Sequence, residues 1–199
     1  MEVKITALGH ACFMMEQDGY RTVIDPYADG MIPGLPALEV VADAVYCSHE
    51  HGDHNAREAV GLFTAEKIAP YSVAEYTTPH DDQGGALRGM NTVRIFDYNG
   101  LRIAHLGDIG CFPDEELAQA LKGVHCMMIP VGGYYTIGCQ TAYQIIRAAN
   151  PKVVIPMHYR TDKTGFDVLS HIDDFMKLWG PNSPCILPLN VGEHAHINY

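Results

Sequence analysis

Short apolar runs alternate with turn-forming residues along the chain, and this pattern predicts many short strands and helices. The dipeptides Asp18-Gly19 and Asn99-Gly100 each lie between two apolar runs, which favours β-hairpins at both positions. Further short strands are expected near the C-terminus. The main predicted strands are 3–8, 12–16, 22–24, 44–47, 93–97, 101–105, 127–131 and 153–156.

Helical patterns concentrate in the second half of the chain, where strands and helices alternate. Gly123 and the pair Asn150-Pro151 mark the ends of two helices, and the Gly- and Pro-rich stretch 29–38 predicts a loop. Hairpins followed by strand–helix units indicate one α/β layered domain over residues 1–199, with sheets inside and helices outside. The predicted helices are 114–122, 140–149 and 167–179, with a weaker helical pattern over 55–62.

The composition is that of a globular protein, with 47% hydrophobic and 19% charged residues in a chain of 199. The net charge of −11 argues against nucleic acid or an anionic membrane as the main partner, so a small-molecule substrate is expected. No apolar run is long enough to span a bilayer and no signal peptide is visible, which favours a cytoplasmic protein. The oligomeric state stays open, and a homo-oligomer is compatible with the sequence.

The run His49-Glu50-His51-Gly52-Asp53-His54 carries the chemistry. It places four metal-binding groups within six residues, directly after the strand predicted at 44–47. The side chains at 49, 51 and 53 can converge because Gly52 lets the backbone bend, and His54 can then reach a second metal on the other side of Asp53. Imidazole and carboxylate groups suit zinc, iron or manganese. Three histidines and an aspartate in this order favour a metal site over a solvated polar loop.

This H-x-H-x-D-H motif resembles the signature of the metallo-β-lactamase superfamily, and the whole chain resembles a branch of small metal-dependent hydrolases related to the ascorbate-6-phosphate lactonase family. The resemblance implies an α/β (α+β) fold, a four-layer αββα sandwich with the metals at one edge between the two sheets. The other stretches that carry it are Gly9-His10-Ala11, Ile24-Asp25-Pro26, His80-Asp81-Asp82, Arg88-Gly89-Met90-Asn91-Thr92, Leu106-Gly107-Asp108, Ile129-Pro130-Val131-Gly132-Gly133 and Ile155-Pro156-Met157-His158-Tyr159.

The resemblance also implies the rest of the ligand set: a third histidine for the first metal, an aspartate that bridges both metals, and a last histidine for the second. The implied first site is His49, His51 and His80 with Asp108, and the implied second site is Asp53, His54 and His158 with Asp108. Asp108 and His158 each follow a predicted strand, which would hold them firmly.

Two other histidines compete with His80, which lies in a polar loop. His105 lies three residues before Asp108, an offset that points the two side chains to opposite faces of an extended strand, so we expect His105 to be packed or to support the site. His125 opens a buried strand and has no carboxylate near it in sequence. His80 therefore remains the predicted ligand.

Supporting and substrate-contacting residues are predicted around this centre. We expect His10 and Asp25 beneath the metals, with Asp25 accepting an imidazole N–H; the equal alternative for Asp25 is a turn residue before Pro26. Cys111 and the pair Gly138-Cys139 depart from the pattern of the related hydrolases. None of these residues is a predicted metal ligand, so the departures bear on the substrate and leave the predicted metal centre unchanged. The candidate substrate contacts are Arg88, Tyr134, Tyr135, Tyr159 and Arg160, for which surface ion pairs or packing are the alternatives.

The predicted cofactors are two divalent ions, zinc first, with manganese or iron as alternatives. Two metals that share a water lower its pKa from ~15.7 toward ~7, so a bridging hydroxide becomes the nucleophile. Asp108 would bridge the metals and Asp53 would orient the hydroxide. The predicted activity is hydrolysis of a small ester or lactone, phosphorylated or not; the alternatives are a small phosphodiesterase or nuclease, and a non-catalytic metal-binding or sensing protein.

Overall fold

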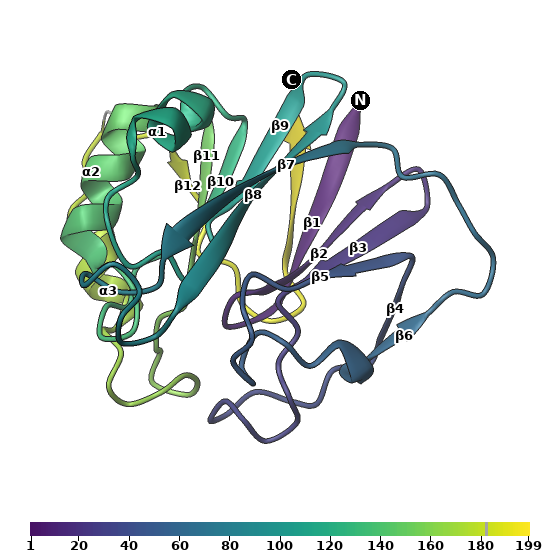
Figure 1. The fold of residues 1–199 in the computed structure, drawn as a ribbon, viewed down its shortest axis with the longest axis horizontal. Helices are drawn as coiled ribbons and strands as arrows, with labels where there is room; N and C mark the ends of the chain where they lie inside the picture. Colours follow the sequence, from purple (N-terminus) through teal and green to yellow (C-terminus); the bar gives the residue numbers. More distant parts are fainter. Residues whose placement is uncertain (182) are drawn as a thin grey trace.

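The computed structural model describes residues 1–181 and 183–199 and shows two β-sheets packed face to face (Figure 1). The first sheet has the strand order β13-β1-β2-β3-β5, and it contains the predicted Asp18-Gly19 hairpin between β2 and β3. Its strands are β1 (Glu2–Gly9), β2 (Cys12–Gln17), β3 (Tyr20–Ile24), β5 (Ala44–Tyr46) and β13 (His194–Asn198).

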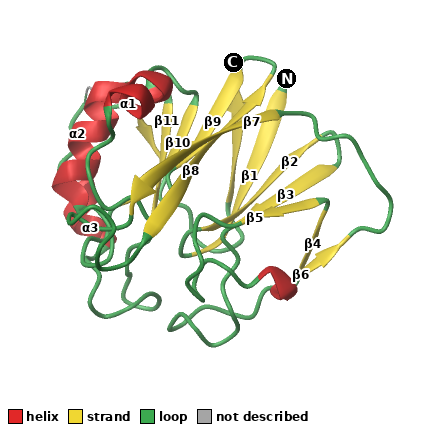
Figure 2. Cartoon of the chain, in the orientation of Figure 1, coloured by secondary structure: helices red, strands yellow, loops and turns green. Residues whose placement is uncertain are grey.

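The second sheet has the order β12-β11-β10-β9-β8-β7, with the Asn99-Gly100 hairpin between β8 and β9. Its outer face is covered by three α-helices (Figure 2). The strands are β7 (Ser72–Pro79), β8 (Met90–Tyr98), β9 (Leu101–His105), β10 (Cys126–Pro130), β11 (Val153–Met157) and β12 (Cys185–Ile186), and the helices are α1 (Glu115–Leu121), α2 (Cys139–Ala149) and α3 (Ile172–Met176). None of the helices in the described part of the chain has the length and hydropathy that a bilayer-spanning helix needs.

The alternation of side chains along each strand divides the apolar residues between two cores. On β10, Cys126 and Met128 face the first sheet, whereas Met127 and Ile129 face the helices. Strand β2 divides its residues in the same manner, with Phe13 between the two sheets. The predicted mixed α/β layered fold is therefore confirmed.

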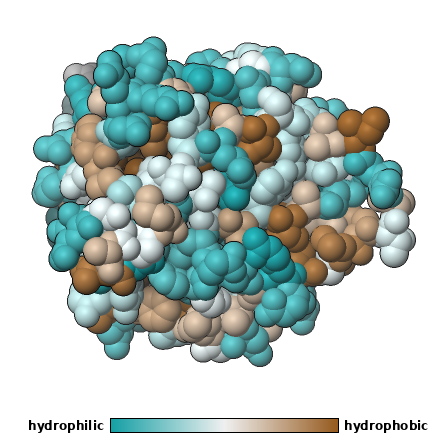
Figure 3. Space-filling view, in the orientation of Figure 1, coloured by the Kyte–Doolittle hydropathy of each residue, from teal (hydrophilic) through white to brown (hydrophobic). Residues whose placement is uncertain are grey.

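The outer face of the first sheet is covered differently from the helical layer of the predicted αββα sandwich. A loop carrying Tyr27 and Ile32 packs there, together with a small sheet formed by β4 (Val40–Ala42) and β6 (Val60–Leu62). The helix expected over 55–62 is wrong: this stretch forms a 3-10 turn, Arg57–Ala59, and then β6, because Val60 to Leu62 pair with β4. Figure 3 shows hydrophobic side chains at the right of the view, where Figure 1 places these two strands.

Two other expectations differ from the structure. The helix predicted at 167–179 is shortened to α3, because Ser170 and His171 are held by backbone contacts to Gly132 and Arg160 and His171 then caps the helix. Strand β7 is missing from the predicted strands because it is an edge strand whose polar and mostly exposed residues carry no apolar pattern. Backbone pairing with β8 holds β7 in an extended conformation that its own sequence does not indicate.

The strand directions bring several chain segments to one edge of the sandwich. In the first sheet, β1, β3 and β5 run in the same direction, and in the second sheet β7, β9, β10 and β11 do so. The loops that follow β1, β3, β5 and β11 lie in the lower half of Figure 1. Each of the predicted metal ligands lies in a segment that follows β5, β7, β9 or β11.

The N-terminus of α1 supplies a test of the fold that is independent of function. The carboxylate of Asp114 accepts a hydrogen bond from the backbone N–H of Leu117 at 2.9 Å and so caps the helix. We expect Asp114→Ala to lower the free energy of unfolding by about 1 kcal/mol, because an N–H of the first turn loses its acceptor. Urea unfolding measures the change, with Glu116→Ala as the control in the same turn; equal stability of the two variants would contradict the capping role.

Candidate metal centre

The residues of the centre follow the carboxyl ends of strands from both sheets. His10 follows β1, Asp25 follows β3, and His158 follows β11, and all three adopt a left-handed backbone conformation with φ between 51° and 57°. Non-glycine residues seldom adopt this conformation, and they retain it where the surrounding structure enforces it. The backbone therefore turns sharply at each strand end and directs these side chains inward.

The structure brings the seven predicted ligands together in overlapping groups. In each group, one potential ligand atom from every residue lies within 4.8 Å of the others. The groups are His49, His51 and His80; His10, Asp53, His54 and His158; and His49, His54 and Asp108. The first two contain the expected ligands of the two metal sites apart from Asp108, which is in the third group, and the second also contains His10.

One oxygen of Asp108 lies between the two groups. Its Oδ2 is 3.8 Å from Nε2 of His49 and 3.3 Å from Nε2 of His80 on one side. On the other side it is 3.3 Å from Nε2 of His54 and 3.2 Å from Nε2 of His158. Oδ2 of Asp108 therefore lies within 3.8 Å of ring nitrogens from both groups.

Several nitrogen and oxygen atoms that face this space have no hydrogen-bond partner among the described residues. They include Nε2 of His49, His54, His80 and His158, and Oδ1 of Asp108, and all of them are buried. Buried polar atoms without a partner are costly, and such atoms seldom occur in groups in a native protein. Imidazole nitrogens and carboxylate oxygens are also the ligands that zinc prefers, so the donor set fits a divalent metal.

A buried network centred on Asp25 orients two of the imidazoles. Because a carboxylate can only accept, Nδ1–H of His54 donates to Asp25 at 2.8 Å. The hydroxyl of Ser48 also donates to Asp25, at 2.6 Å, and in turn accepts from Nδ1 of His49 at 2.9 Å. Both rings therefore carry their proton on Nδ1, which leaves the Nε2 lone pairs free to face the centre.

The electrostatics of the centre favour cations. Burial opposes ionisation of Asp25, Asp53 and Asp108, yet hydrogen bonds and charges from neighbouring histidines outweigh burial and lower the pKa of each. Burial and the nearby His54 lower the pKa of His49 to about 3, so this ring is neutral at pH 7. Burial disfavours the charged form of His54, yet the carboxylates of Asp108 and Asp25 raise its pKa well above its usual value. The carboxylates of the centre thus favour a positive charge beside them, which divalent ions would also supply.

His10 lies closer to the centre than a purely supporting role requires. Its Nε2 is 3.3 Å from Oδ2 of Asp53, and its ring centroid is 4.0 Å from that of His158. His105 is committed elsewhere: Nε2–H donates to the carbonyl oxygen of Ala11 at 2.9 Å, and Nδ1 accepts from the N–H of Gly107 at 3.1 Å.

The sequence analysis assigned no role to Ser48 or Asn91, which both support the ligands. Oδ1 of Asn91 accepts from the backbone N–H of Asp108 at 2.8 Å, and its Nδ2 donates to the carbonyl oxygen of Leu106 at 3.0 Å. Gly107 permits this arrangement, because a Cβ there would overlap Asn91 and Ser48. In the sequence, only the position of Ser48 beside His49 points to its role, and serine is too common in loops for this position to indicate a function.

The five candidate substrate contacts separate into two sets. Arg88 and Tyr135 line a hollow of about 320 Å³ beside the metal ligands His51, His80 and Asp108, and Tyr134 borders an adjoining hollow. Tyr159 lines a third hollow that includes none of the predicted ligands, and Nε of Arg160 donates to the carbonyl oxygen of Leu169 at 2.9 Å. The structure does not bring these last two side chains to the ligand cluster.

The loop after His80 is organised by one carboxylate. Asp81 accepts hydrogen bonds of 2.8 to 2.9 Å from the backbone N–H groups of Gln83, Gly85, Leu87 and Arg88. Burial opposes ionisation of Asp81, but these N–H donors outweigh it and lower its pKa to about 2. These hydrogen bonds hold the backbone of the loop from 82 to 88, and so they position the backbone from which the Arg88 side chain extends.

Removing the negative charge of Asp25 tests the orienting network. An amide nitrogen cannot accept, so Asp25→Asn loses at least one of the three hydrogen bonds that Ser48 and His54 donate. We expect metal affinity, measured by calorimetric titration with zinc, to fall about 10–100-fold. Asp18→Asn is the matched control, because Asp18 also has a positive φ but lies in an exposed hairpin turn; equal affinities in the two variants would exclude the orienting role.

Asp81→Asn tests the organisation of the loop. The amide of asparagine offers one acceptor atom in place of two, so at least two of the four backbone N–H groups lose their partner. We expect hydrogen exchange at Gln83, Gly85, Leu87 and Arg88 to accelerate about tenfold, because hydrogen bonds to a charged acceptor are lost. The exposed neighbour gives the control Asp82→Asn. Unchanged protection in the Asp81 variant would show that other contacts hold the loop.

Sequence comparison places the chain in a known family. The profile of the β-lactamase superfamily domain matches residues 4–158. A UPF0173 metal-dependent hydrolase of Pelotomaculum thermopropionicum is 32% identical over 195 aligned residues, which cover 80% of this chain and 85% of that protein. A second, from Thermococcus onnurineus, is 30% identical over 226 positions that cover 96% of this chain and 98% of that protein.

Structural comparison agrees with this assignment. A crystal structure from Thermotoga maritima, of a candidate zinc-dependent hydrolase of the metallo-β-lactamase superfamily, has a TM-score of 0.70 at 30% identity and covers 92% of this chain and 96% of that chain. The metallo hydrolase Igni18 of Ignicoccus hospitalis has a TM-score of 0.71 over 100% of both chains, and its 21% identity shows a shared fold alone. Kinship with the ascorbate-6-phosphate lactonases stays a prediction. The chain belongs to the β-lactamase superfamily and, within it, to the UPF0173 family of metal-dependent hydrolases.

Proposed function

We propose that this metal-dependent hydrolase holds two divalent ions and cleaves a small ester or lactone, phosphorylated or not. Zinc is the proposed metal, because its preferred nitrogen and oxygen ligands match the donor set. The residues that would hold the ions are His49, His51 and His80 for the first, Asp53, His54 and His158 for the second, and Asp108 for both.

The position of Asp108 Oδ2 carries the proposal. It lies 3.2 to 3.8 Å from four imidazole nitrogens that belong to two separate groups. A single-metal site needs no carboxylate between two sets of histidines, and a purely structural carboxylate would be hydrogen-bonded through both oxygens. The buried Oδ1 of Asp108 has no partner within residues 1–181 and 183–199. These observations support a bridged pair of ions.

When bound, two such ions supply Lewis acidity toward the substrate carbonyl and toward the attacking water. The two carboxylates of the centre differ in their exposure: the side chain of Asp53 is 17% exposed and that of Asp108 2%. Asp53 also lines the hollow of about 320 Å³. Nε2–H of His10 donates to Oδ2 of Asp53, and we assign the Asp53 carboxylate to orient the attacking water.

The other residues of this hollow define the space for the substrate. Met31, Tyr135 and Phe166 form its apolar walls, and Arg88 adds a positive charge. A volume of about 320 Å³ suits a small molecule, because ligand sites typically enclose about 300–1,000 Å³. The net charge of −11 counts against a nucleic-acid substrate.

Metal analysis and hydrolysis assays on one pair of variants test the proposal. We expect about two zinc ions per chain in protein purified without chelator and fewer in Asp108→Ala. Loss of a residue that hydrogen-bonds to a metal ligand typically lowers metal affinity or activity about 10–100-fold. Because Asp108 would itself bind both ions, we expect Asp108→Ala to lower the rate of ester or lactone hydrolysis at least about a hundredfold.

Asp162→Ala is the matched control, because the side chain of Asp162 is 94% exposed and Asp162 lies outside the ligand groups. It should retain the wild-type metal content and activity. A wild-type protein that binds no zinc, manganese or iron even after supplementation would refute the two-metal site. A fully loaded protein that is inactive on esters and lactones but active on phosphodiesters would overturn the substrate class alone.

A further inference from the structure

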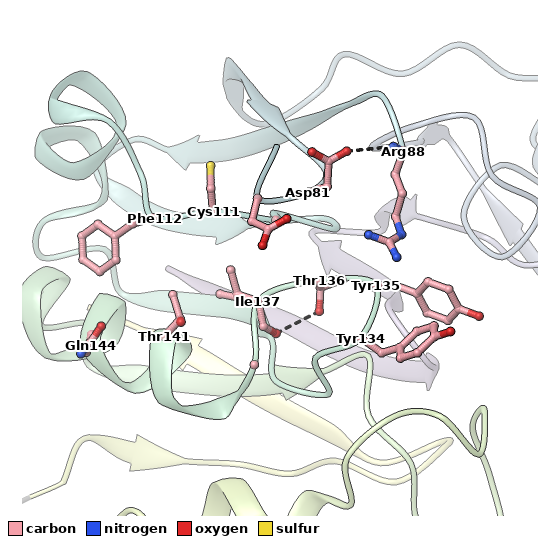
Figure 4. A pocket seen from close by; sticks show the side chains of 13 residues that line it. Asp81, Arg88, Cys111, Phe112, Tyr134, Tyr135, Thr136, Ile137, Thr141 and Gln144 are labelled. Carbon is pink, nitrogen blue, oxygen red and sulfur yellow. Dashed lines mark hydrogen bonds between the residues drawn. The ribbon is translucent and has the colours of Figure 1, made fainter. Parts of the chain in front are cut away.

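Arg88 lies at the junction of two hollows. Arg88 and Tyr135 line the hollow of about 320 Å³ beside the metal ligands, and both also line a second hollow of about 560 Å³. Thr141 and Gln144 of helix α2 contribute to the wall of this outer hollow. In Figure 4 the Arg88 side chain points away from the Asp81 carboxylate and toward the two tyrosines. A molecule that occupies both hollows has to pass this guanidinium.

The guanidinium of Arg88 is uncommitted within the described part of the chain. It forms no ion pair and donates no side-chain hydrogen bond there, although Arg88 is only partly exposed. Other arginines are engaged: Arg94 pairs with Glu75 at 2.7 Å, and Arg160 donates to a backbone carbonyl. A half-buried arginine with five free N–H donors is prepared to bind an anion.

The contact between Arg88 and Tyr135 orients these donors. The guanidinium carbon lies 5.5 Å from the centroid of the Tyr135 ring, a cation–π distance. Such a contact uses no N–H group in a hydrogen bond, so the N–H donors of Arg88 stay available for two parallel hydrogen bonds. Carboxylate and phosphate groups have the matching pair of oxygens.

The carboxylates near Arg88 differ in whether other groups already bind them. Asp81 is fully engaged by four backbone N–H groups, and Asp53 and Asp108 are engaged by histidines. The exposed Asp82 lines the outer hollow and is the one carboxylate there without such a commitment. Its charge would repel an anion from the part of the outer hollow that Asp82 lines.

We propose that Arg88 is a specificity-determining residue that binds a carboxylate or phosphate group of the substrate, while the ester or lactone bond lies at the metal ligands. Asp81 and Tyr135 are its positioning residues, the first through the loop backbone and the second through the guanidinium face. The inference rests on the proposed hydrolase function and names the chemical class of its substrate, an ester or lactone with an anionic group close to the scissile bond.

Binding measurements test Arg88 without hydrolysis. NMR titration of the protein as purified, with benzoate, phenyl phosphate and the neutral benzamide as probes, compares wild type, Arg88→Gln and Arg147→Gln. Arg147 is an exposed arginine of α2 that lines neither of the two hollows, so it controls for the loss of one positive charge. We expect Arg88→Gln alone to weaken at least one of the two anions about 10–100-fold and to leave benzamide unchanged.

Hydrolysis of a matched pair of esters provides the second measurement. The two esters are 4-nitrophenyl hydrogen glutarate, which carries a free carboxylate, and its neutral methyl ester. We expect wild type and Arg147→Gln to prefer the charged ester about 10–100-fold in kcat/KM, and Arg88→Gln to lose this preference while it retains its metal content.

The outcomes separate the two proposals. Equal rates of wild type on both esters, together with anion binding that Arg88→Gln does not change, would overturn the role of Arg88 and leave the hydrolase function standing. A loaded protein that cleaves neither ester would count against the hydrolase function, and the titrations would still decide whether Arg88 binds anions. Weakening of benzoate alone or of phenyl phosphate alone would identify which of the two groups the substrate carries.

Discussion

A single buried oxygen, Oδ2 of Asp108, imposes the main constraint on this structure. Four imidazole nitrogens approach it to within 3.2 to 3.8 Å, and most of these atoms have no other partner among the described residues. Such a cluster is unfavourable without a cation, because it combines buried charge with unsatisfied polar groups. Because the cluster does not stabilise itself, the packing of the two sheets has to hold these side chains together. Each group of ligands combines residues that follow strands of both sheets, so the packing between the sheets fixes the geometry within each group.

The hydrogen bonds around the cluster explain how the sheets retain it. Asp25 connects the rings of His49 and His54 through Ser48, and Asn91 holds the backbone of Asp108. Left-handed backbone at His10, Asp25 and His158 stores strain of about 1–3 kcal/mol at each residue. The apolar core between the sheets compensates this strain. Hydrogen bonds that orient the ligands in this way preorganise the centre for a metal, and preorganisation lowers the cost of binding.

The sequence predicts the strand ends better than the surfaces that cover the strands. The H-x-H-x-D-H run and the apolar strands before Asp108 and His158 carry strong local patterns, and the structure brings all seven expected ligands together. Strand β7 and the stretch from 55 to 62 lack such patterns, because partner strands order them. Ser48 and Asn91 could not be assigned for a related reason. Their roles depend on contacts across 23 and 17 residues, and serine and asparagine are common in loops.

The predicted metal ligands and the proposed substrate contacts lie in different parts of the fold. The predicted metal ligands follow strands of the two sheets, whereas Arg88 and Tyr135 lie in loops after β7 and β10. Cys111 and Gly138, where the sequence predicts a departure from related hydrolases, line the outer hollow and are absent from the ligand groups. Backbone hydrogen bonds join these loops to the ligand segments, from His80 to Gly89 and from Ile137 to Ile109. The strand ends therefore hold the loops in position, and the loop side chains shape the hollow beside the ligand cluster.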